Sequence, residues 1–466
     1  MTLDEVIEKA RRLVEPSPEE RERRVSVARK VIEVVENGLK ERGLTNFEVS
    51  LQGSLAKDTW LPENRDIDIF IILSKEHPYE TLRSLVKILI EIAQDSGIEW
   101  RLKYAQHPYI QYIIESYEID IVPCYRIEPG EKPLTAADRT PLHTRYVLSK
   151  LAQKPELKTE IRLFKRFLKV VGIYGAEIKV EGFSGYLAEL LTIYYGSFRE
   201  LIHEVADKWR PGKTVIDIEK HHTDLRKVRT LFKDSPLVVI DPVDPMRNAA
   251  AAVSLHSMSK LILAGKIFLN KPSIRFFEYS NERPSTELLK GRLLPPTVLI
   301  IFPYIENLPP ETVWGEAKRL CRSLCNTFER YEYKIYDSSA WTDERNIIVI
   351  ALTLERETLP EYELHRGPPV YSDNVLNFIE KYVNDHESVG PYVIGERAVV
   401  IKRRKYNTAE KLIRAQLCQI APKHLRRICN NVKILIIRNV EDLAQVPEPA
   451  RDFVLRFMIK RESWLY

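Results

Sequence analysis

Two aspartates stand one residue apart at the start of an apolar segment. In the stretch GSLAKDTWLPENRDIDIF, residues 53–70, Asp66 and Asp68 flank the first isoleucine of that segment. Because successive side chains of a β-strand point to opposite faces, the two carboxylates share one face and the isoleucines point into the core. A third carboxylate, Asp120 in YEIDIVPCY, also has an isoleucine on each side. If the two strands pair, three negative charges converge and repel one another unless a cation holds them.

An isolated pair of aspartates has a simpler interpretation: the polar face of a strand end is exposed to solvent. The third carboxylate favours metal binding, since hard divalent cations such as Mg²⁺ are bound by carboxylates together with substrate phosphates. Two such ions held by Asp66, Asp68 and Asp120 would activate a hydroxyl group and stabilise a departing pyrophosphate. Gly53 and Ser54, at an expected strand-to-helix turn, offer backbone N–H groups and a hydroxyl to a triphosphate. The pattern as a whole predicts phosphoryl transfer.

The hydrophobic pattern indicates the elements that position these residues. FEVSLQGS and DIDIFIILS alternate as strands, YETLRSLVKILIEIAQDSG has the spacing of an amphipathic helix, and YIQYIIESYEIDIVPCY is typical of two strands joined by a tight turn. Ahead of them, Thr2 with Glu5 and Ser17 with Glu20 match capping boxes, which mark the starts of two helices. Residues 1–140 are therefore expected to form an α/β head.

The rest of the chain changes character twice. From ELKTEIRLFKRFLKVVGIYG through FSGYLAELLTIYYGSF the spacing is helical and predicts a helical central domain over residues 141–265. Beyond it, TVLIIFPYI, AKRLCRSLCNTFERY, NIIVIALTLE, SDNVLNFIEKYV and ERAVVIKRRKY alternate strand with helix, so residues 285–466 are expected to form an α+β body and tail. NKPS (270–273) and RPSTELLKGRLLPPT (283–297) are the expected linkers.

Size and composition set the wider limits. A chain of 466 residues is too long for one ordinary core and suggests about three domains. With 44% hydrophobic and 29% charged residues it reads as a globular protein, and a net charge of +5 permits an acidic partner without requiring one. The N-terminus has no apolar stretch typical of a signal peptide, and the longest apolar runs are about half a membrane span. We therefore expect a cytoplasmic protein without membrane contact.

The cysteines give two further expectations. Five cysteines, an odd number in a long chain, argue against a disulfide framework. Cys321 and Cys325 have the spacing to face the same way on a helix, but Cys418 and Cys429 supply no second pair at metal-ligand spacing, which argues against a zinc site.

Several stretches resemble a known family. The pattern GS…DID…EID is similar to that of the polymerase-β-type nucleotidyltransferase superfamily. DRTPLHTRY (138–146), EIRLFKRFLKVVGIYGAE (160–177), VEGFSGYLAELL (180–191) and DPVDPMRNAAAAVSL (241–255) closely resemble the archaeal-type, class I CCA-adding tRNA nucleotidyltransferases. The likeness extends more weakly through LHRGPPVYSDNVLNFI and GERAVVIKRRKYNTAEKLIR, so it covers nearly the whole chain.

The resemblance implies an α+β multidomain fold: a polymerase-β-like nucleotidyltransferase head, a helical central domain and C-terminal α+β domains that bind tRNA. It implies template-independent addition of C, C and A to the 3′ end of tRNA from CTP and ATP, with repair of incomplete ends and Mg²⁺ as cofactor. It further implies contacts with the acceptor stem and TΨC arm of the tRNA, and that the protein can form a homodimer.

Residue by residue, the resemblance assigns roles that each have a plainer structural interpretation. Asp66, Asp68 and Asp120 match the metal-binding carboxylates, although relatives often have glutamate at the first of them. The nucleotide-contacting positions are Ser54, Lys57, His143, Lys165 and Tyr174, with Lys57 where relatives commonly carry arginine, and Arg247 matches the arginine that reads the base edge. Lys165 could also belong to a solvated helix face, and His143 could cap a loop. Tyr174 could cover a helix end, and Arg247 could form a surface ion pair.

The cationic run of Lys402, Arg403, Arg404 and Lys405 lies in the region that holds tRNA in the relatives. A run of four cations is usually a solvated strand edge. Since A-form RNA is recognised mainly by shape, phosphates and 2′-hydroxyls, such a run also suits a phosphate contact.

Two other functions fit parts of the same pattern. A poly(A) or oligoadenylate polymerase would share the catalytic head, but the C-terminal resemblance speaks against it. A catalytically inactive RNA-binding relative would be expected to lack one of the carboxylates, yet all three are present.

Overall fold

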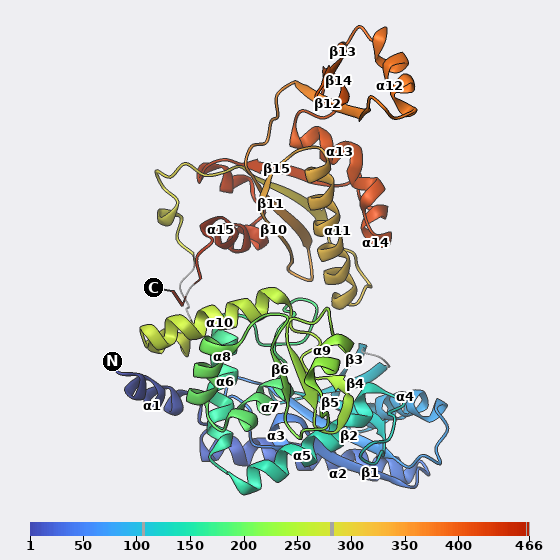
Figure 1. Ribbon diagram of the computed structural model, residues 1–466. Helices are drawn as coiled ribbons and strands as arrows, with labels where there is room; N and C mark the ends of the chain where they lie inside the picture. The colour runs from blue at the N-terminus through green and yellow to red at the C-terminus, as the bar shows by residue number, and fades with distance from the viewer. Residues whose placement is uncertain (105–107, 280–283, 463, 466) are drawn as a thin grey trace. The chain divides into compact units, whose positions relative to one another are not determined.

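The chain forms two compact units that are linked twice. The computed structural model describes all residues except 105–107, 280–283, 463 and 466. The first unit comprises Met1–Asn281 with Glu462–Tyr466, and the second comprises Glu282–Arg461. The boundary falls next to the expected linker at 283–297, and Figure 1 shows the chain returning to the first unit at its C-terminal end.

The head of the first unit is built on a five-stranded sheet of order β1-β2-β5-β4-β3. Its strands are β1 (Phe47–Gln52), β2 (Asp66–Leu73), β3 (Glu99–Tyr104), β4 (Pro108–Ile114) and β5 (Tyr117–Tyr125). Strand β2 runs parallel to β5, and the other neighbours are antiparallel. Apart from β3, which the hydrophobic pattern did not reveal, these strands are the ones that it predicts.

Alternation along β2 places its two aspartates on one face of the sheet and the neighbouring isoleucines on the other. The side chains of Ile67, Ile69 and Ile71 are fully buried in one core with residues of α2 (Pro18–Glu41) and α4 (Glu80–Asp95). The aspartates of β2 point to the opposite face. At about 25 cal/mol per Å² of apolar surface, this burial fixes the register, since a slip of one residue would place the aspartates in the core.

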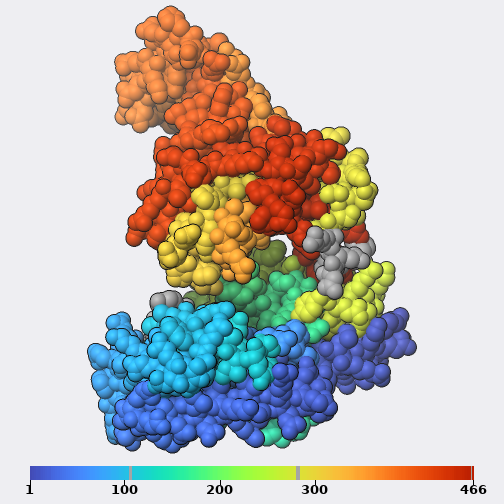
Figure 2. Space-filling model, turned by 180° about the vertical axis from the view of Figure 1, so that it is seen from behind, coloured from blue at the N-terminus to red at the C-terminus, as the bar shows by residue number. Residues whose placement is uncertain are grey.

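The two predicted capping boxes are present at the first helices. The Thr2 and Ser17 side chains each accept a hydrogen bond from the backbone of Glu5 and Glu20, and both glutamates return one. The helix that Thr2 caps, α1 (Leu3–Val14), packs into the central core and not against the head's sheet. Figure 2 shows its dark blue residues beside the yellow-green residues of α10.

The central part of the first unit packs helices around a large aromatic and aliphatic core. These helices are α5 (Thr140–Gln153), α6 (Leu157–Val171), α7 (Gly185–Tyr195), α8 (Phe198–Lys208) and α10 (Leu255–Asn270), with 3₁₀ turns at η1 (Ala136–Arg139) and η2 (Ile274–Phe276). The expected helical domain also carries a small sheet that the sequence pattern did not reveal. It consists of β6 (Val215–Asp217), β7 (Val238–Asp241) and β8 (Asp244–Asn248), with α9 (Leu225–Leu231) between β6 and β7.

The second unit contains two sheets with helices against them. The larger sheet has the order β10-β11-β9-β15, formed by β9 (Thr297–Pro303), β10 (Ile335–Thr342), β11 (Ile347–Leu354) and β15 (Lys433–Ile437). One face packs on α11 (Pro310–Arg330), α13 (Ala409–Ile420) and α14 (Lys423–Arg427), and the other on α15 (Arg451–Ile459). The smaller sheet is β12-β14-β13, formed by β12 (Tyr362–Pro369), β13 (Ser388–Ile394) and β14 (Arg397–Arg403), with α12 (Asn374–Val383) on one face. Short 3₁₀ turns complete this unit at η3 (Thr286–Leu288), η4 (Glu441–Gln445) and η5 (Glu448–Ala450). The predicted α+β multidomain fold is confirmed.

One expectation about the cysteines is wrong. Cys418 and Cys429 form a disulfide, with their Cα atoms 5.3 Å apart, whereas Cys124, Cys321 and Cys325 are free. The pair joins α13 to the turn after α14, and this proximity arises from the tertiary fold, so an odd number of cysteines could not exclude it. Among the residues described, no helix combines the length and apolar character that crossing a membrane requires.

Candidate active site

The three predicted carboxylates lie on two neighbouring strands. In the parallel pairing of β2 with β5, Asp68 lies directly opposite Asp120, and Asp66 opposite Glu118. Cross-strand partners share a face, so Asp120 projects from the same face as the two aspartates of β2. Asp66 is exposed at the start of its strand, whereas Asp68 and Asp120 are partly buried.

Burial, together with the neighbouring negative charges, raises the pKa of each carboxylate. Burial and the neighbouring charges of Asp120 and Asp66 raise the pKa of Asp68 to about 6. Burial also raises the pKa of Asp120, although Gln111 on β4 donates a 2.8 Å hydrogen bond from Nε2 to Asp120 Oδ1 and opposes the rise. Burial and Glu118 raise the pKa of Asp66. Negative charge is therefore costly here, and a bound cation would relieve that cost.

The donor set suits a hard cation. In the part of the chain that the structure describes, no three His, Cys, Asp or Glu side chains form a ready-made metal cage. Mg²⁺ rarely needs one, because it takes carboxylate oxygens from the protein and its remaining ligands from water and substrate phosphates. The all-oxygen chemistry of Asp66, Asp68 and Asp120, together with their raised pKa values, fits such an ion.

Gly53 allows the carboxylate of Asp68 to lie against the backbone. Strand β1 ends at Gln52, opposite Asp68, and the short helix α3 (Gly53–Ala56) begins at the next residue. Gly53 has φ +65°, and a Cβ atom there would lie 1.8 Å from Asp68 Oδ2. Only glycine therefore fits between the strand end and the carboxylate. Ser54 follows in the first turn of α3, which confirms the predicted strand-to-helix turn.

Lys57 and Lys165 converge on a buried glutamate. Lys57 Nζ lies 2.6 Å from Glu189 Oε2 on α7, and Lys165 Nζ on α6 lies 2.8 Å from Glu189 Oε1. Thr59 Oγ1 donates to the same glutamate at 2.6 Å. All three charged side chains are at most 7% exposed, so the solvated-face interpretation of Lys165 is wrong.

This ion triad carries two positive charges and one negative charge. Burial alone would raise the pKa of Glu189, but Lys165 and Lys57 together hold it at about 2. Burial lowers the pKa of Lys165 to about 8 despite its bond to Glu189. The charge of Lys57 also lowers the pKa of Asp68, which places the triad within electrostatic reach of the carboxylates.

Tyr174 lies next to the same triad. Its hydroxyl is 2.9 Å from the position that a Cβ atom on Gly185 would take, and Lys165 Cε is 3.9 Å from that position. Gly185, the first residue of α7, therefore leaves room for both side chains. Burial raises the pKa of Tyr174 and keeps it a neutral hydroxyl.

His143 and Arg247 both bind Asp241, the last residue of β7. Asp241 Oδ2 lies 2.9 Å from His143 Nε2 and 2.6 Å from an Arg247 guanidinium nitrogen. Its other oxygen accepts hydrogen bonds from the Tyr186 hydroxyl at 2.9 Å and from the backbone N–H of Val243 at 3.1 Å. Apart from Ser54, the residues that the resemblance assigned to nucleotide contacts thus lie in two groups, one around Glu189 and one around Asp241.

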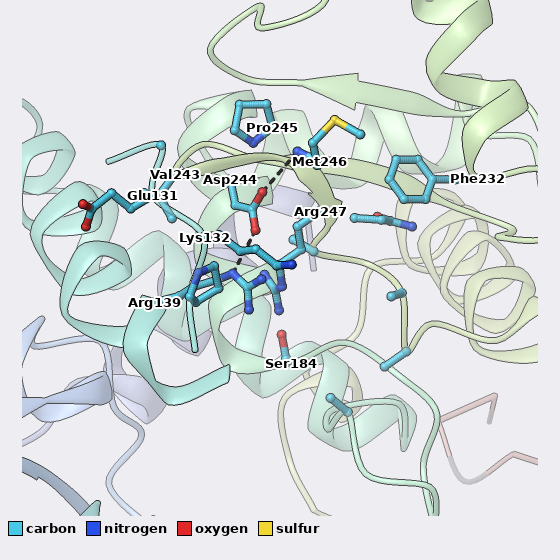
Figure 3. Close-up of a pocket in the computed structure, with 17 residues that line it drawn as sticks. Glu131, Lys132, Arg139, Ser184, Phe232, Val243, Asp244, Pro245, Met246 and Arg247 are labelled. Atoms are coloured by element: carbon cyan, nitrogen blue, oxygen red, sulfur yellow. Dashed lines mark hydrogen bonds and ion pairs between the residues drawn. The ribbon is translucent and has the colours of Figure 1, made fainter. Parts of the chain in front are cut away.

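Arg247 also lines a pocket of about 980 Å³ in the first unit. Figure 3 shows Lys132, Arg139 and Arg247 gathered on its wall, with Ser184 nearby. Arg139 is fixed by Asp244, whose Oδ2 lies 2.9 Å from Arg139 Nε. The pocket therefore offers cationic donors on a largely apolar surface, a suitable environment for a nucleotide base with its phosphates.

Sequence reasoning missed Glu189, Asp241, Gln111 and Tyr186. Glu189 had a detectable signal, a lone acid in the otherwise apolar helix FSGYLAELL. Asp241 belongs to DPVDPMRN, next to the arginine that was selected. Gln111 lies directly opposite Asp120 in the pairing of β4 with β5, which only the register reveals.

The cationic run of the second unit is mostly neutralised. Lys402 pairs with Glu363 at 3.4 Å, Arg403 with Glu361 at 2.5 Å, and Arg404 with both Glu332 and Glu363. Lys405 is exposed, and its Nζ lies 5.3 Å from the ring centre of Tyr406.

Family models match three parts of the chain. The nucleotidyltransferase domain model matches residues 32–143, the model of the second domain of tRNA nucleotidyltransferase matches 159–278, and the model of the CCA-adding enzyme C-terminal domain matches 297–435. Together with the paired carboxylates of the head, these matches define the chain as a nucleotidyltransferase.

Full-length relatives narrow the class. CCA-adding enzymes of Pyrobaculum aerophilum and Sulfurisphaera tokodaii are 46% and 41% identical to this chain, covering 89% and 90% of it and 94% and 92% of their own lengths. The CCA-adding enzyme of Saccharolobus islandicus is 36% identical over 98% of this chain and 99% of its own. A solved structure of Cid1 poly(U) polymerase with Mg 3′-dATP aligns with 59% of this chain and 98% of that chain, at 16% identity and a TM-score of 0.48. The chain belongs to the CCA-adding enzyme family and is a tRNA nucleotidyltransferase.

Proposed function

We propose that this enzyme builds the C-C-A end of tRNA one nucleotide at a time from CTP and ATP, without a nucleic-acid template, and completes partial ends. The terminal 3′-hydroxyl of the tRNA attacks the α-phosphate of the nucleotide and gives its proton to solvent. A P–O bond forms to the α-phosphorus, the bond from that phosphorus to the bridging oxygen of the β-phosphate breaks, and pyrophosphate leaves. The observation that carries this proposal is the placement of Asp68 opposite Asp120 on paired strands, in a chain that aligns with CCA-adding enzymes over most of its length.

Asp66, Asp68 and Asp120 would hold Mg²⁺. When bound, Mg²⁺ supplies a lower pKa to the attacking hydroxyl and positive charge to the departing pyrophosphate. Gln111 orients the Asp120 carboxylate by its 2.8 Å hydrogen bond to Oδ1. Gly53 keeps the backbone clear of Asp68, so that the carboxylate retains its position during the reaction.

The Glu189 triad would attract and align the triphosphate. Its net charge is positive and it is fixed in a buried position, so it needs little reorganisation when a polyanion binds. Ser54, in the first turn of α3, and Tyr174, beside Lys165, would add hydroxyl groups. In this arrangement Lys57 acts mainly as a fixed point charge, because its ammonium group is already committed to Glu189.

Arg247 would select the base. On the Watson–Crick edge, cytosine and adenine present a ring-nitrogen acceptor, at N3 and N1 respectively, whereas uracil and guanine present an N–H donor at the same place. A guanidinium group has only donors, so it favours cytosine and adenine. With uracil or guanine it would face another donor and leave an unsatisfied contact.

The second unit would contribute to tRNA binding. We assign the acceptor stem and TΨC arm to the second unit, where the exposed Lys405 and Arg403 are the members of the cationic run best placed for phosphate contacts. A tRNA substrate also implies action in the cytoplasm. Assembly into a homodimer is part of the same proposal.

The decisive experiment uses labelled CTP or ATP with tRNAs that end before CCA, after C and after CC. We expect C, C and A, respectively, to be added first. Asp68→Ala and Asp120→Ala should abolish incorporation while tRNA binding survives. Asp95→Ala, which removes an exposed carboxylate paired with Arg42, serves as the control and should remain fully active. Turnover in either site variant contradicts the metal assignment, and long tails of A would favour a poly(A) polymerase.

A further inference from the structure

We infer that Asp241 is the positioning residue for base selection: it fixes the guanidinium group of Arg247 and thereby sets the preference for C and A over U and G. This inference rests on the proposed function, because it concerns how the base-reading arginine is held.

The contacts of Asp241 come from three separate elements. His143 is on α5, Tyr186 on α7, and Arg247 on β8, and all three donate to its carboxylate within 2.9 Å. The N–H of Val243 adds a fourth bond at 3.1 Å. Asp241 itself is fully buried, whereas Arg247 is 36% exposed and lines the pocket. The carboxylate is therefore an internal anchor, and the guanidinium group is the part that meets the ligand.

The anchor restricts a flexible side chain. An arginine has several rotatable bonds, and ordering them for a ligand costs up to about 2 kcal/mol of conformational entropy. Asp241 binds one guanidinium nitrogen of Arg247 in the free protein, so the side chain is already ordered before the nucleotide binds. The remaining N–H groups keep one direction, which is what discrimination between an acceptor and a donor on the base requires.

Asp241 also fixes the neighbouring imidazole. Burial would raise the pKa of Asp241, but His143 and Arg247 hold it at about 2, so the carboxylate is ionised and can only accept. His143 must then carry its proton on Nε2, and burial lowers its pKa so that the ring stays neutral. The ring stacks on Tyr186 with centres 3.9 Å apart. His143 thus packs beside the anchor as a neutral group of fixed orientation.

The test compares kcat/KM for CTP with kcat/KM for UTP, using a tRNA that lacks CCA. Asp241→Asn keeps the shape of the side chain and removes its charge. We expect the CTP-to-UTP ratio to fall by about 10- to 100-fold, the discrimination that one good bidentate base contact provides. Glu219→Gln is the matched control: Glu219 also accepts from a tyrosine, Tyr146, and a cation, Lys150, but it lies outside the pocket. Its ratio should equal that of the wild type.

A double-mutant cycle separates positioning from general disruption. If Asp241 acts through Arg247, then Asp241→Asn should lower the ratio in the wild type but add no loss in Arg247→Ala. Tyr186→Phe, which removes one donor and keeps the ring stacked, provides a milder variant if Asp241→Asn folds poorly, and should lower the ratio by a few-fold.

The outcomes distinguish the proposed function from the positioning role of Asp241. A wild-type enzyme that adds C, C and A, with Asp241→Asn or Tyr186→Phe equally selective, would overturn the inference and leave the proposed function intact. Equal losses from Asp241→Asn with and without Arg247 would overturn it as well. A wild-type enzyme that adds neither C nor A would defeat the proposed function and the inference with it.

Discussion

Gly53 is the residue whose substitution should separate folding from catalysis. Its φ is +65°, and a Cβ atom at this position would lie 1.8 Å from Asp68 Oδ2, so Gly53→Ala must displace the carboxylate. We expect incorporation to fall by about 100-fold or more, since a shift of about 1 Å in a catalytic group can have that effect. Gly97→Ala is the control, because Gly97 has φ +64° with nothing near its Cβ position. It should share the backbone cost of about 1–2 kcal/mol in unfolding free energy and keep full activity.

Asp68 should make the metal-free protein sensitive to pH. Its pKa of about 6 in the folded protein is above the ordinary value of 3.8, so its contribution to stability is present below pH 3.8 and is lost as the pH rises through 6. In the presence of a chelator, Asp68→Asn should therefore be more stable than the wild type at pH 8 and equally stable near pH 3.5. Thermal unfolding across this range measures the difference.

The same experiment with Mg²⁺ tests why the carboxylates are crowded. Adding the ion at pH 8 should raise the melting temperature of the wild type more than that of Asp68→Asn, because the variant offers one carboxylate fewer. An advantage of Asp68→Asn that does not change with pH, or an equal response of both proteins to Mg²⁺, would contradict the assignment.

Among the elements, α6 and α7 meet the segment after α3 at a buried charge. Glu189→Gln would leave Lys57 and Lys165 without their anion, and breaking a buried pair in this way costs about 3–5 kcal/mol of unfolding free energy. Glu219→Gln breaks a partly exposed pair with Lys150 and should cost less than about 1 kcal/mol. Chemical denaturation of the two variants at pH 7 gives both values.

The pH response identifies the cause of that loss. Without Glu189 the pKa of Lys165, which burial already lowers to about 8, falls further, so this lysine becomes neutral and the instability of Glu189→Gln should shrink as the pH rises toward about 10. A loss that is constant between pH 7 and pH 10 would point to packing and not to unpaired charge.

Local patterns predicted the elements of this fold but not their partners. In DIDIFIIL the polar residues stand only at Asp66 and Asp68, where the strand is not fully buried, and the capping box of Ser17 is a contact within four residues, so both follow from the sequence. The anchoring of Arg247 by Asp241 depends on how β7, β8 and α5 pack, and that arrangement is a property of the tertiary fold. The same holds for the disulfide of Cys418 and for the ion pairs that neutralise Arg404.

The buried ion triad around Glu189 is a further feature that the local sequence patterns did not predict. Lys165 was expected to be a nucleotide contact or a solvated residue, and it is neither freely solvated nor unpaired. Because Lys165 donates a hydrogen bond to Glu189, its ammonium group is held in one position. Helices α6 and α7 thus hold charged side chains in fixed positions, and strands β2 and β5 carry the carboxylates.

At the scale of the whole molecule, the end of the chain belongs to the first unit. Trp464 is 3% exposed in the central core, its ring 5.4 Å from that of Phe276, and Lys260 forms a 2.8 Å ion pair with Glu462. The second unit is therefore connected to the first by both of its ends.

Removing this buried side chain should destabilise the first unit, most of whose residues come much earlier in the sequence. Trp464→Ala should lower the unfolding free energy of the first unit by about 3–5 kcal/mol, the usual cost of deleting a buried tryptophan side chain. Trp341→Ala, which removes a ring stacked on Phe453 in the second unit, is the matched control. In calorimetry each variant should lower the melting transition of its own unit, because separate cores unfold as separate cooperative units. If Trp464→Ala lowered only the transition that Trp341→Ala lowers, the C-terminal residues would belong to the second core and the double connection would be wrong.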